Sequence, residues 1–238
     1  VADVLVKLRD KGAIGDKVAV VNVADAFGIE LMNAGKPAME AAGFEIVYET
    51  SYPLGQQDFA PIISAAKAAE PDAFVAFSYP GDTFGLSAQA KIANLDVGAF
   101  YVGVATAFPA YLGANGAAAE GVLGAGAVNP DAPGMAEWRA RHKDVTGVDA
   151  DYWASAMTYS SLQILEQAIS KVGSLDKAAV TEAIKGGTCD TVLGEMTLDG
   201  NVNRKFWTVG QWQGGKFYGV ASTGIGGEAE PVAKNGWE

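Results

Sequence analysis

The sequence predicts an α/β protein built on a parallel β-sheet that is covered by helices on both faces. Apolar, β-branched runs alternate with helical patterns over the first half of the chain, and this alternation is typical of a buried parallel sheet. The predicted helices are rich in alanine, and turn-like EPD and NLD breaks separate them from the strands. We therefore expect a doubly wound sheet in this half.

The chain opens with an amphipathic helix, because Val1, Val4, Leu5 and Leu8 recur at helical spacing. No capping residue precedes this helix, so the pattern is already running at the first residue. Five strands and four helices then alternate. The strands are predicted at Val18–Val23, Ile46–Thr50, Ala73–Ser78, Phe100–Gly103 and Val122–Val128, and the helices at Ile29–Ala42, Phe59–Ala69, Thr83–Asn94 and Pro109–Gly113.

The texture of the sequence changes after Asn129, where two prolines mark a crossover to another part of the fold. Three helices are predicted at Met135–Val145, Tyr152–Val172 and Lys177–Lys185, followed by a β-rich stretch over Leu193–Ala221. Hairpin turns are expected at the DG of Asp199 and the QGG of Gln213. The glycine- and charge-rich residues from Gly224 to Glu238 are expected to form a strap or tail.

The composition bounds the class of function. The 238 residues are 49% hydrophobic and 19% charged, which is enough for a substantial core. The formal net charge of −11 argues against a nucleic-acid partner, because neutralising phosphates needs clustered Lys and Arg. Every apolar run is shorter than the ~20 residues of a membrane helix. The absence of a signal peptide at the first residues fits either a cytosolic protein or an exported one already cleaved.

The residues that most often carry catalysis have no catalytic context here. His142 is the single histidine and lies among charges in RARHKD, where a solvated helix face is the simpler interpretation. Cys189, the single cysteine, rules out an internal disulfide and has no obvious partner in GGTCDT. The serines lack a G-x-S-x-G context. We predict no catalytic residue.

The sequence contains no complete motif for phosphate or metal binding. Ala24 to Phe27 separate the first strand from Gly28, so backbone amides cannot close on a pyrophosphate there. A calcium-loop pattern begins in the second half but has Arg204 at its sixth position and Gly210 at its twelfth, so a hairpin turn is expected instead. We predict no cofactor and no metal. The calcium-like residues are Asp199, Asn201 and Asn203.

Aromatic and small polar residues follow three of the predicted strands. Phe27 follows the first strand, Tyr79 the third, and Thr106 with Phe108 the fourth. The carboxyl ends of parallel strands share one edge of a sheet, where open α/β sheets bind ligands. These side chains favour a ligand cleft with aromatic walls over simple rim packing. Asp25 has two readings, as a helix N-cap or as a polar ligand contact.

These stretches, in this order, resemble the substrate-binding proteins of ABC transporters of the branched-chain amino acid and amide type, which have the type I periplasmic binding protein fold. The resemblance runs from the first helix to about Ala221 and is carried by KVAVVNVADAFGIEL, YPLGQQDFAPIISAAKAAEPDAFVAFSYPGD, FYVGVATAF, DADYWASAMTYSSLQILEQAI and VLGEMTLDGNVNRKFWTVGQWQGGKF. It implies two α/β lobes that close like a hinge over a small solute, with no enzymatic activity. The predicted ligand-binding residues are Asp25, Phe27, Gly28, Tyr79, Ala105, Thr106 and Phe108.

The sequence departs from this family pattern at the predicted site. Amino-acid-binding members place an acidic residue near Ala105 to pair with the α-ammonium of the ligand, and alanine cannot do so. A buried ammonium without a carboxylate carries a large desolvation penalty, unless Asp25 or Asp82 takes that role. Phe27 stands where an aromatic, usually Tyr, covers the ligand. Both differences favour an aromatic or apolar carboxylate over an ordinary amino acid.

Relatives begin with roughly a hundred further residues that this sequence lacks, so we expect the first part of the N-terminal lobe to be absent. Residues 1–129 are predicted to form the C-terminal-type lobe, 130–223 an incomplete N-terminal-type lobe whose hairpin strands cross back, and 224–238 a tail. The apolar face of Tyr152–Val172 is then expected to be exposed unless another segment covers it.

The resemblance implies an exported, periplasmic protein that binds a small solute and delivers it to a membrane permease. A ligand-sensing domain of a receptor or regulator with the same fold is the alternative. An α/β enzyme is the third hypothesis, and it has the least support in the residues.

Overall fold

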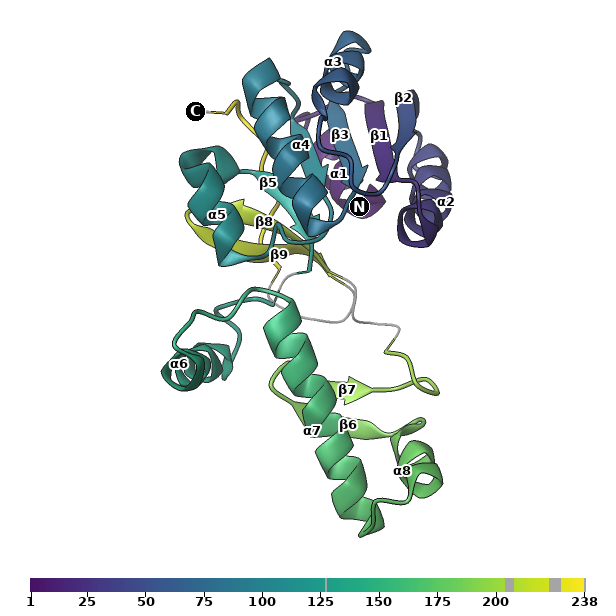
Figure 1. Ribbon diagram of the computed structural model, residues 1–238, viewed down its shortest axis with the longest axis vertical. Helices are drawn as coiled ribbons and strands as arrows, with labels where there is room; N and C mark the ends of the chain where they lie inside the picture. Colours follow the sequence, from purple (N-terminus) through teal and green to yellow (C-terminus); the bar gives the residue numbers. More distant parts are fainter. Residues whose placement is uncertain (127, 204–207, 223–227, 238) are drawn as a thin grey trace.

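The computed structural model of the chain describes residues 1–126, 128–203, 208–222 and 228–237. Its centre is a seven-stranded sheet with strand order β2-β1-β3-β4-β5-β8-β9 (Figure 1). Strands β2, β1, β3, β4 and β5 run parallel, as their pairings show. The strands are β1 (Lys17–Val23), β2 (Glu45–Tyr52), β3 (Ala73–Phe77), β4 (Ala99–Val102), β5 (Val122–Ala125), β8 (Thr208–Gln213) and β9 (Lys216–Ser222). The predicted α/β class with a mostly parallel sheet is confirmed.

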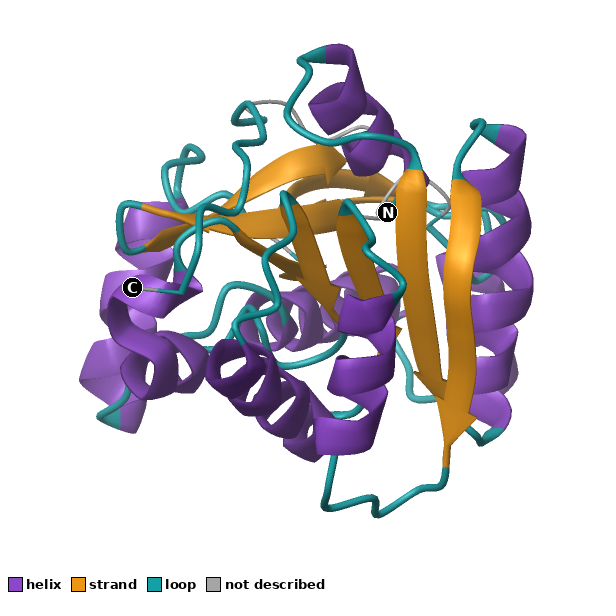
Figure 2. Ribbon diagram, turned by 90° about the horizontal axis from the view of Figure 1, so that it is seen from above, coloured by secondary structure: helices purple, strands orange, loops and turns teal. Residues whose placement is uncertain are grey.

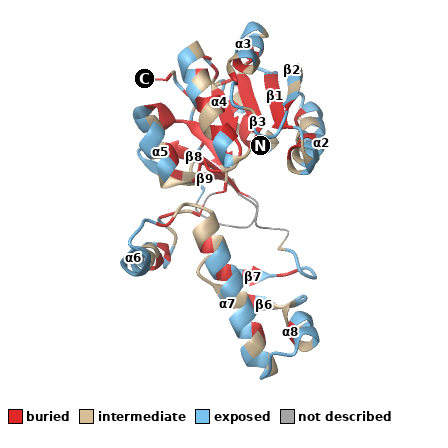
Figure 3. Ribbon diagram, viewed as in Figure 1, coloured by how far each residue is buried: buried red, intermediate tan, exposed pale blue. Residues whose placement is uncertain are grey.

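Helices cover both faces of this sheet because successive strand residues point to opposite sides (Figure 2). Val18 and Val20 of β1 belong to the apolar cluster that includes α1 and α2, whereas Val21 belongs to the cluster that includes α3, α4 and α5. The central strands β1, β3 and β4 are almost entirely buried, whereas the edge strand β2 is mostly half-buried or exposed (Figure 3). The helices are α1 (Ala2–Asp10), α2 (Ala26–Ala41), α3 (Ala60–Ala68), α4 (Pro80–Ala93) and α5 (Pro109–Asn115), with a 3₁₀ turn at Gly116–Ala119.

Two strands from the far end of the sequence, β8 and β9, extend the sheet beyond β5. The sequence predicts hairpin strands that cross back but does not give their place in the strand order. β8 pairs antiparallel with β5, placing Gln211 opposite Leu123, and β9 pairs antiparallel with β8. Trp212 and Phe217 then enter the core that packs under α4 and α5. The added strands protect the edge of β5, which would otherwise expose unpaired backbone groups.

Helices and a hairpin form a second, smaller part of the molecule, drawn below the sheet in Figure 1. It contains α6 (Met135–Thr146), α7 (Ala154–Val172), α8 (Lys177–Ile184) and the hairpin of β6 (Thr188–Thr191) and β7 (Gly194–Thr197). The strand at Thr188–Thr191 was not predicted, because TCDT has no apolar alternation. The apolar side chains Tyr159, Leu162 and Leu165 on α7 are 40%, 59% and 40% exposed, as the sequence predicted for this helix.

Backbone hydrogen bonds fix the start of α7 to the sheet. The Tyr152 amide donates to the Ala107 carbonyl over 3.0 Å, and the Tyr152 carbonyl accepts from the Val128 amide over 2.6 Å. The Tyr152 ring packs edge-on against Trp212 with 5.5 Å between centroids. The helix begins at Ala154 rather than at the predicted Tyr152, since Asp151 accepts hydrogen bonds from the amides of Trp153 and Ser155.

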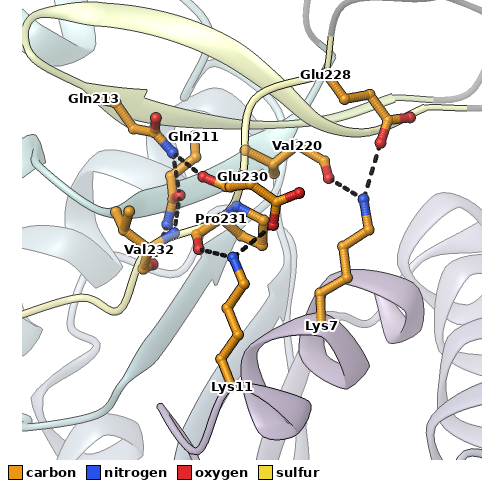
Figure 4. Close-up of polar contacts among 9 residues, drawn as sticks. All are labelled: Lys7, Lys11, Gln211, Gln213, Val220, Glu228, Glu230, Pro231 and Val232. Carbon is orange, nitrogen blue, oxygen red and sulfur yellow. Dashed lines mark hydrogen bonds and ion pairs between the residues drawn. The ribbon is translucent and has the colours of Figure 1, made fainter.

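A C-terminal strap of residues 228–237 runs back across α1, β8 and β9 (Figure 4). Lys7 on α1 and Lys11, the residue that follows this helix, pair with Glu228 and Glu230 over 2.9 and 2.6 Å. Beyond the region drawn, the Trp237 indole donates to the Leu95 carbonyl over 2.8 Å. The predicted strap is thus docked where it is described; residues 224–227 and 238 of that prediction lie outside the described residues, as do residue 127 of the predicted fifth strand and residues 204–207.

The side chain of Gln211 also holds the strap, and it does so from a buried position. It has no exposed surface, donates to the carbonyls of Gly121 and Val232 over 2.8 and 2.7 Å, and accepts from the Val232 amide over 2.9 Å. Its amide therefore replaces a neighbouring strand in satisfying these backbone groups.

Gln211→Leu is expected to lower the free energy of unfolding by at least about 2 kcal/mol, because it leaves buried backbone groups without partners. Lys11→Ala removes an exposed ion pair and is expected to cost less than about 1 kcal/mol. Urea unfolding of both variants measures the difference, and equal losses would show that the strap is held by charge instead.

Candidate functional site

The first turns of α2 and α4 lie side by side at the carboxyl ends of the neighbouring strands β1 and β3. Phe27, in the first turn of α2, and Tyr79, the residue before α4, stack with ring centroids 4.8 Å apart and an interplanar angle of 23°. Both rings are half-buried and keep part of their surface accessible. The structure thus brings two of the predicted site residues into direct contact as a stacked aromatic pair.

Asp25 joins the two helix starts. Its Oδ1 accepts from the Gly28 amide over 3.0 Å, which caps α2, and its Oδ2 accepts from the Tyr79 hydroxyl over 2.8 Å. This hydrogen bond and the negative charge of Asp25 raise the pKa of Tyr79. The N-cap interpretation of Asp25 is correct, and the same carboxylate also positions the aromatic pair.

Asp82 positions Tyr79 through its backbone amide. Its Oδ2 accepts from the Tyr79 amide and from the Tyr52 hydroxyl, each over 3.2 Å, and its side chain is buried. Burial raises the pKa of Asp82, with the hydrogen bonds acting in the opposite direction. Tyr52, at the end of β2, enters the site through its hydrogen bond to Asp82. Burial raises the pKa of Tyr52 as well. Sequence reasoning missed Tyr52. The spacing of three residues between Tyr79 and Asp82 is a helix-capping signal, but nothing local links Tyr52 to this pair.

Gly28 is required for close packing rather than for ligand contact. A Cβ at this position would lie 2.0 Å from the Val23 carbonyl oxygen. The residue is buried, and its amide donates to Asp25. Its place in the site is therefore indirect, since it lets α2 start directly beneath the end of β1.

Ala105 and Thr106 lie beneath the surface that we predicted them to line. Both have no exposed area, and the Thr106 hydroxyl donates to the Val102 carbonyl over 2.8 Å. Ala105 has a φ of 85°, a conformation that costs an L-residue roughly 1 kcal/mol. The partly exposed side chain of this loop belongs to Val104. In this conformation Ala105 and Thr106 have no exposed area and shape the loop, and contact of either residue with a solute stays a prediction.

Phe108 precedes α5, on the same sheet edge, after β4. It is half-buried and stays a predicted ligand contact. Trp153, which sequence reasoning did not select, lies where the second part of the molecule joins the sheet, and its ring fills the space beside Gly126. The sequence placed it in the first turn of the predicted helix Tyr152–Val172, where an aromatic residue gave no signal of a site.

A groove of about 310 Å³ lies elsewhere, between α6, α7 and the β6–β7 hairpin. Trp138 and Tyr159 contribute its rings, and Arg141, Glu137 and Asp190 its charges. Its lining mixes both signs of charge, so it defines no single ligand chemistry.

The part of the chain that the structure describes shows no cluster of three or more His, Cys, Asp or Glu side chains able to hold a metal ion. Within the same residues, no helix is both long and apolar enough to cross a bilayer. His142 lies on α6 and contacts the Trp138 ring, and the Cys189 thiol is buried.

Comparison with known proteins identifies the class to which this fold and sheet edge belong. The periplasmic binding protein family model matches residues 1–216. Leu/Ile/Val-binding protein homolog 4 of Brucella abortus is 26% identical over 201 residues, which are 80% of this chain and 47% of that protein. The chain therefore belongs to the periplasmic binding protein family, and it spans about half the length of the curated relatives it matches.

Solved structures agree with this fold. A leucine-, isoleucine-, valine-, threonine- and alanine-binding protein from Brucella ovis, in a closed conformation, has a TM-score of 0.78 at 22% identity, covering 97% of this chain and 63% of its own. An R. palustris ABC-transporter solute-binding protein in complex with benzoate has a TM-score of 0.79 at 16% identity, covering 97% and 64%. These relatives are named as binding proteins, not as enzymes.

The raised pKa of Asp82 predicts a pH dependence of stability. An acid whose pKa is higher in the folded state stabilises the fold below its unfolded value of 3.8, and that contribution is lost as the pH rises through its folded pKa. Asp82→Asn keeps an acceptor for Tyr52 and removes the buried charge. Its stability relative to the parent protein is expected to increase from pH 4 to pH 7.

Thermal unfolding at several pH values measures this effect, with Asp58→Asn as the control because Asp58 is exposed and also accepts from a backbone amide. If Asp82→Asn and the parent protein respond identically to pH, the account of Asp82 is wrong.

Gly28→Ala is expected to lose about 1–3 kcal/mol of stability, because the added methyl group meets the Val23 carbonyl. Gly113→Ala on α5 meets nothing within 4 Å and is expected to gain about 0.5–1 kcal/mol from helix propensity. Chemical unfolding compares them, and a neutral Gly28→Ala would refute the close packing of α2 on β1.

Proposed function

We propose that this chain belongs to the solute-binding component of an ABC importer, which works in the periplasm, binds a small organic solute and delivers it to the membrane permease. The observation that carries the proposal is the Phe27–Tyr79 stack, which is fixed at the ligand-binding edge of the sheet of a periplasmic binding protein fold. A rigid aromatic surface provides contact area at little cost in conformational entropy.

The solute is proposed to lie between this edge and the second part of the molecule. Among the described residues, the two parts meet near Tyr152, whose amide donates to the Ala107 carbonyl, and near Asp131, whose carboxylate pairs with Lys216 of β9 over 3.0 Å. Such a junction suits a hinge, and a solute that contacts both sides favours the closed arrangement by its differential affinity.

The proposed solute class is an aromatic or apolar carboxylate. Val104 and Ala105 supply no acid to pair with an α-ammonium, and Asp82 is buried beneath Tyr79 with its oxygen already accepting two hydrogen bonds. Of the two described acids that form hydrogen bonds with Tyr79, Asp25 is partly exposed and Asp82 is buried. Relatives of this fold include proteins named for branched-chain amino acids and one solved with benzoate, so the fold accommodates both classes.

A panel of solutes tests the class in the intact protein. Benzoate-like and phenylpropanoid acids are expected to raise the unfolding temperature in a saturable way, since a ligand that binds only the folded state stabilises it by mass action. Leucine and valine are expected to have no effect at micromolar concentration. Stabilisation by leucine alone, with no response to aromatic acids, would overturn the proposed class.

The stacked pair is expected to carry the affinity. Tyr79→Ala should weaken binding of a solute that this panel identifies at least about tenfold, because truncating an aromatic hot-spot residue to alanine costs about 2 kcal/mol or more. Tyr79→Phe keeps the ring and should retain most of the affinity. Calorimetric titration measures both, and unchanged affinity in Tyr79→Ala would remove the pair from the site.

A further inference from the structure

The two described side chains that form hydrogen bonds with Tyr79, those of Asp25 and Asp82, are carboxyl groups and accept these bonds. The Tyr79 hydroxyl has one proton, and it is donated to Asp25. Ionised Asp25 only accepts, and each of its oxygens accepts one hydrogen bond from the described residues and has room for a second. The neighbouring exposed residues Ala24, Ala26 and Pro80 have no polar side-chain atom.

The negative charge of Asp25 also disfavours a solute carboxylate at this surface. Asp25 is half-buried, so its charge is less screened by water than that of a fully exposed acid. Among the described contacts no Lys, Arg or His pairs with Asp25; its side-chain partners there are the Gly28 amide and the Tyr79 hydroxyl. A solute carboxylate placed against this surface would meet a like charge without a side-chain donor between them.

We propose that Asp25 is a specificity-determining residue, which selects a solute with a hydrogen-bond donor, such as a phenolic hydroxyl, at the end that lies against the Phe27–Tyr79 stack. The solute's carboxylate then points away from this surface. This inference rests on the proposed function and narrows its solute class to aromatic acids whose donor and carboxylate are at opposite ends of the ring.

Separation of the two ends follows from the same geometry. In an α-amino acid the ammonium and the carboxylate share one carbon atom, so an ammonium bound to Asp25 brings the carboxylate close to the same negative charge. In a para-hydroxy aromatic acid the ring keeps the groups apart, and the ring itself covers the stacked pair.

Three probes test the proposal in the intact protein by calorimetric titration: benzoate, 4-hydroxybenzoate and benzene-1,4-dicarboxylate. 4-Hydroxybenzoate is expected to bind about tenfold or more tightly than benzoate, which is the size of one hydrogen bond to a charged group. Benzene-1,4-dicarboxylate is expected to bind more weakly than benzoate.

Asp25→Asn provides the matched variant. Asparagine still caps α2 through its amide oxygen and is a good N-cap, but it has no charge and gains donors. It is expected to lower the preference for 4-hydroxybenzoate over benzoate severalfold and to improve the relative binding of the dicarboxylate. Asp176→Asn is the control, because Asp176 caps α8 in the same way through the Ala179 amide, away from the aromatic pair.

The outcomes separate the two proposals. Equal binding of benzoate and 4-hydroxybenzoate, unchanged in Asp25→Asn, would overturn the role of Asp25 and leave the proposed function standing. If none of the three aromatic acids binds, the proposed solute class fails, and the inference fails with it. A shift of preference in Asp176→Asn equal to that in Asp25→Asn would assign the effect to charge in general and overturn the specific role.

Discussion

The hydrogen bond between Asp25 and the Tyr79 hydroxyl is the contact on which the proposed site depends. It joins the starts of two helices that follow neighbouring strands, over a distance of 2.8 Å. Asp82 and Tyr52 hold the other side of Tyr79, so the ring is positioned by a continuous set of polar contacts from β2 to α2. A side chain fixed in this way loses little freedom when a solute binds.

Local patterns were enough to predict the fold class and most strands and helices of the sheet. The buried strands have long apolar runs, and the helices between them are separated by turn signals, so local pattern and tertiary structure agree. The antiparallel addition of β8 and β9 was not predictable in the same way, because pairing between Leu123 and Gln211 depends on contacts 88 residues apart in the sequence (211 − 123). The strand Thr188–Thr191 was missed because its residues show no apolar period.

The site was predicted in part. The rule that ligands bind at the carboxyl ends of parallel strands placed Phe27, Tyr79 and Phe108 at one edge, and the structure shows the first two in contact. The same rule cannot tell an exposed loop residue from a buried one, so it selected Ala105 and Thr106 where Val104 has the accessible side chain. Tyr52 and Trp153 enter through packing between distant segments, which no local motif records.

A crystal structure of the intact protein with the solute that co-purifies with it tests the central claim most directly. The account predicts an aromatic or apolar solute in van der Waals contact, about 4 Å, with the rings of Phe27 and Tyr79, and an intact Asp25–Tyr79 hydrogen bond. A solute bound away from this pair, or an α-amino acid whose binding separates Asp25 from Tyr79, would contradict it.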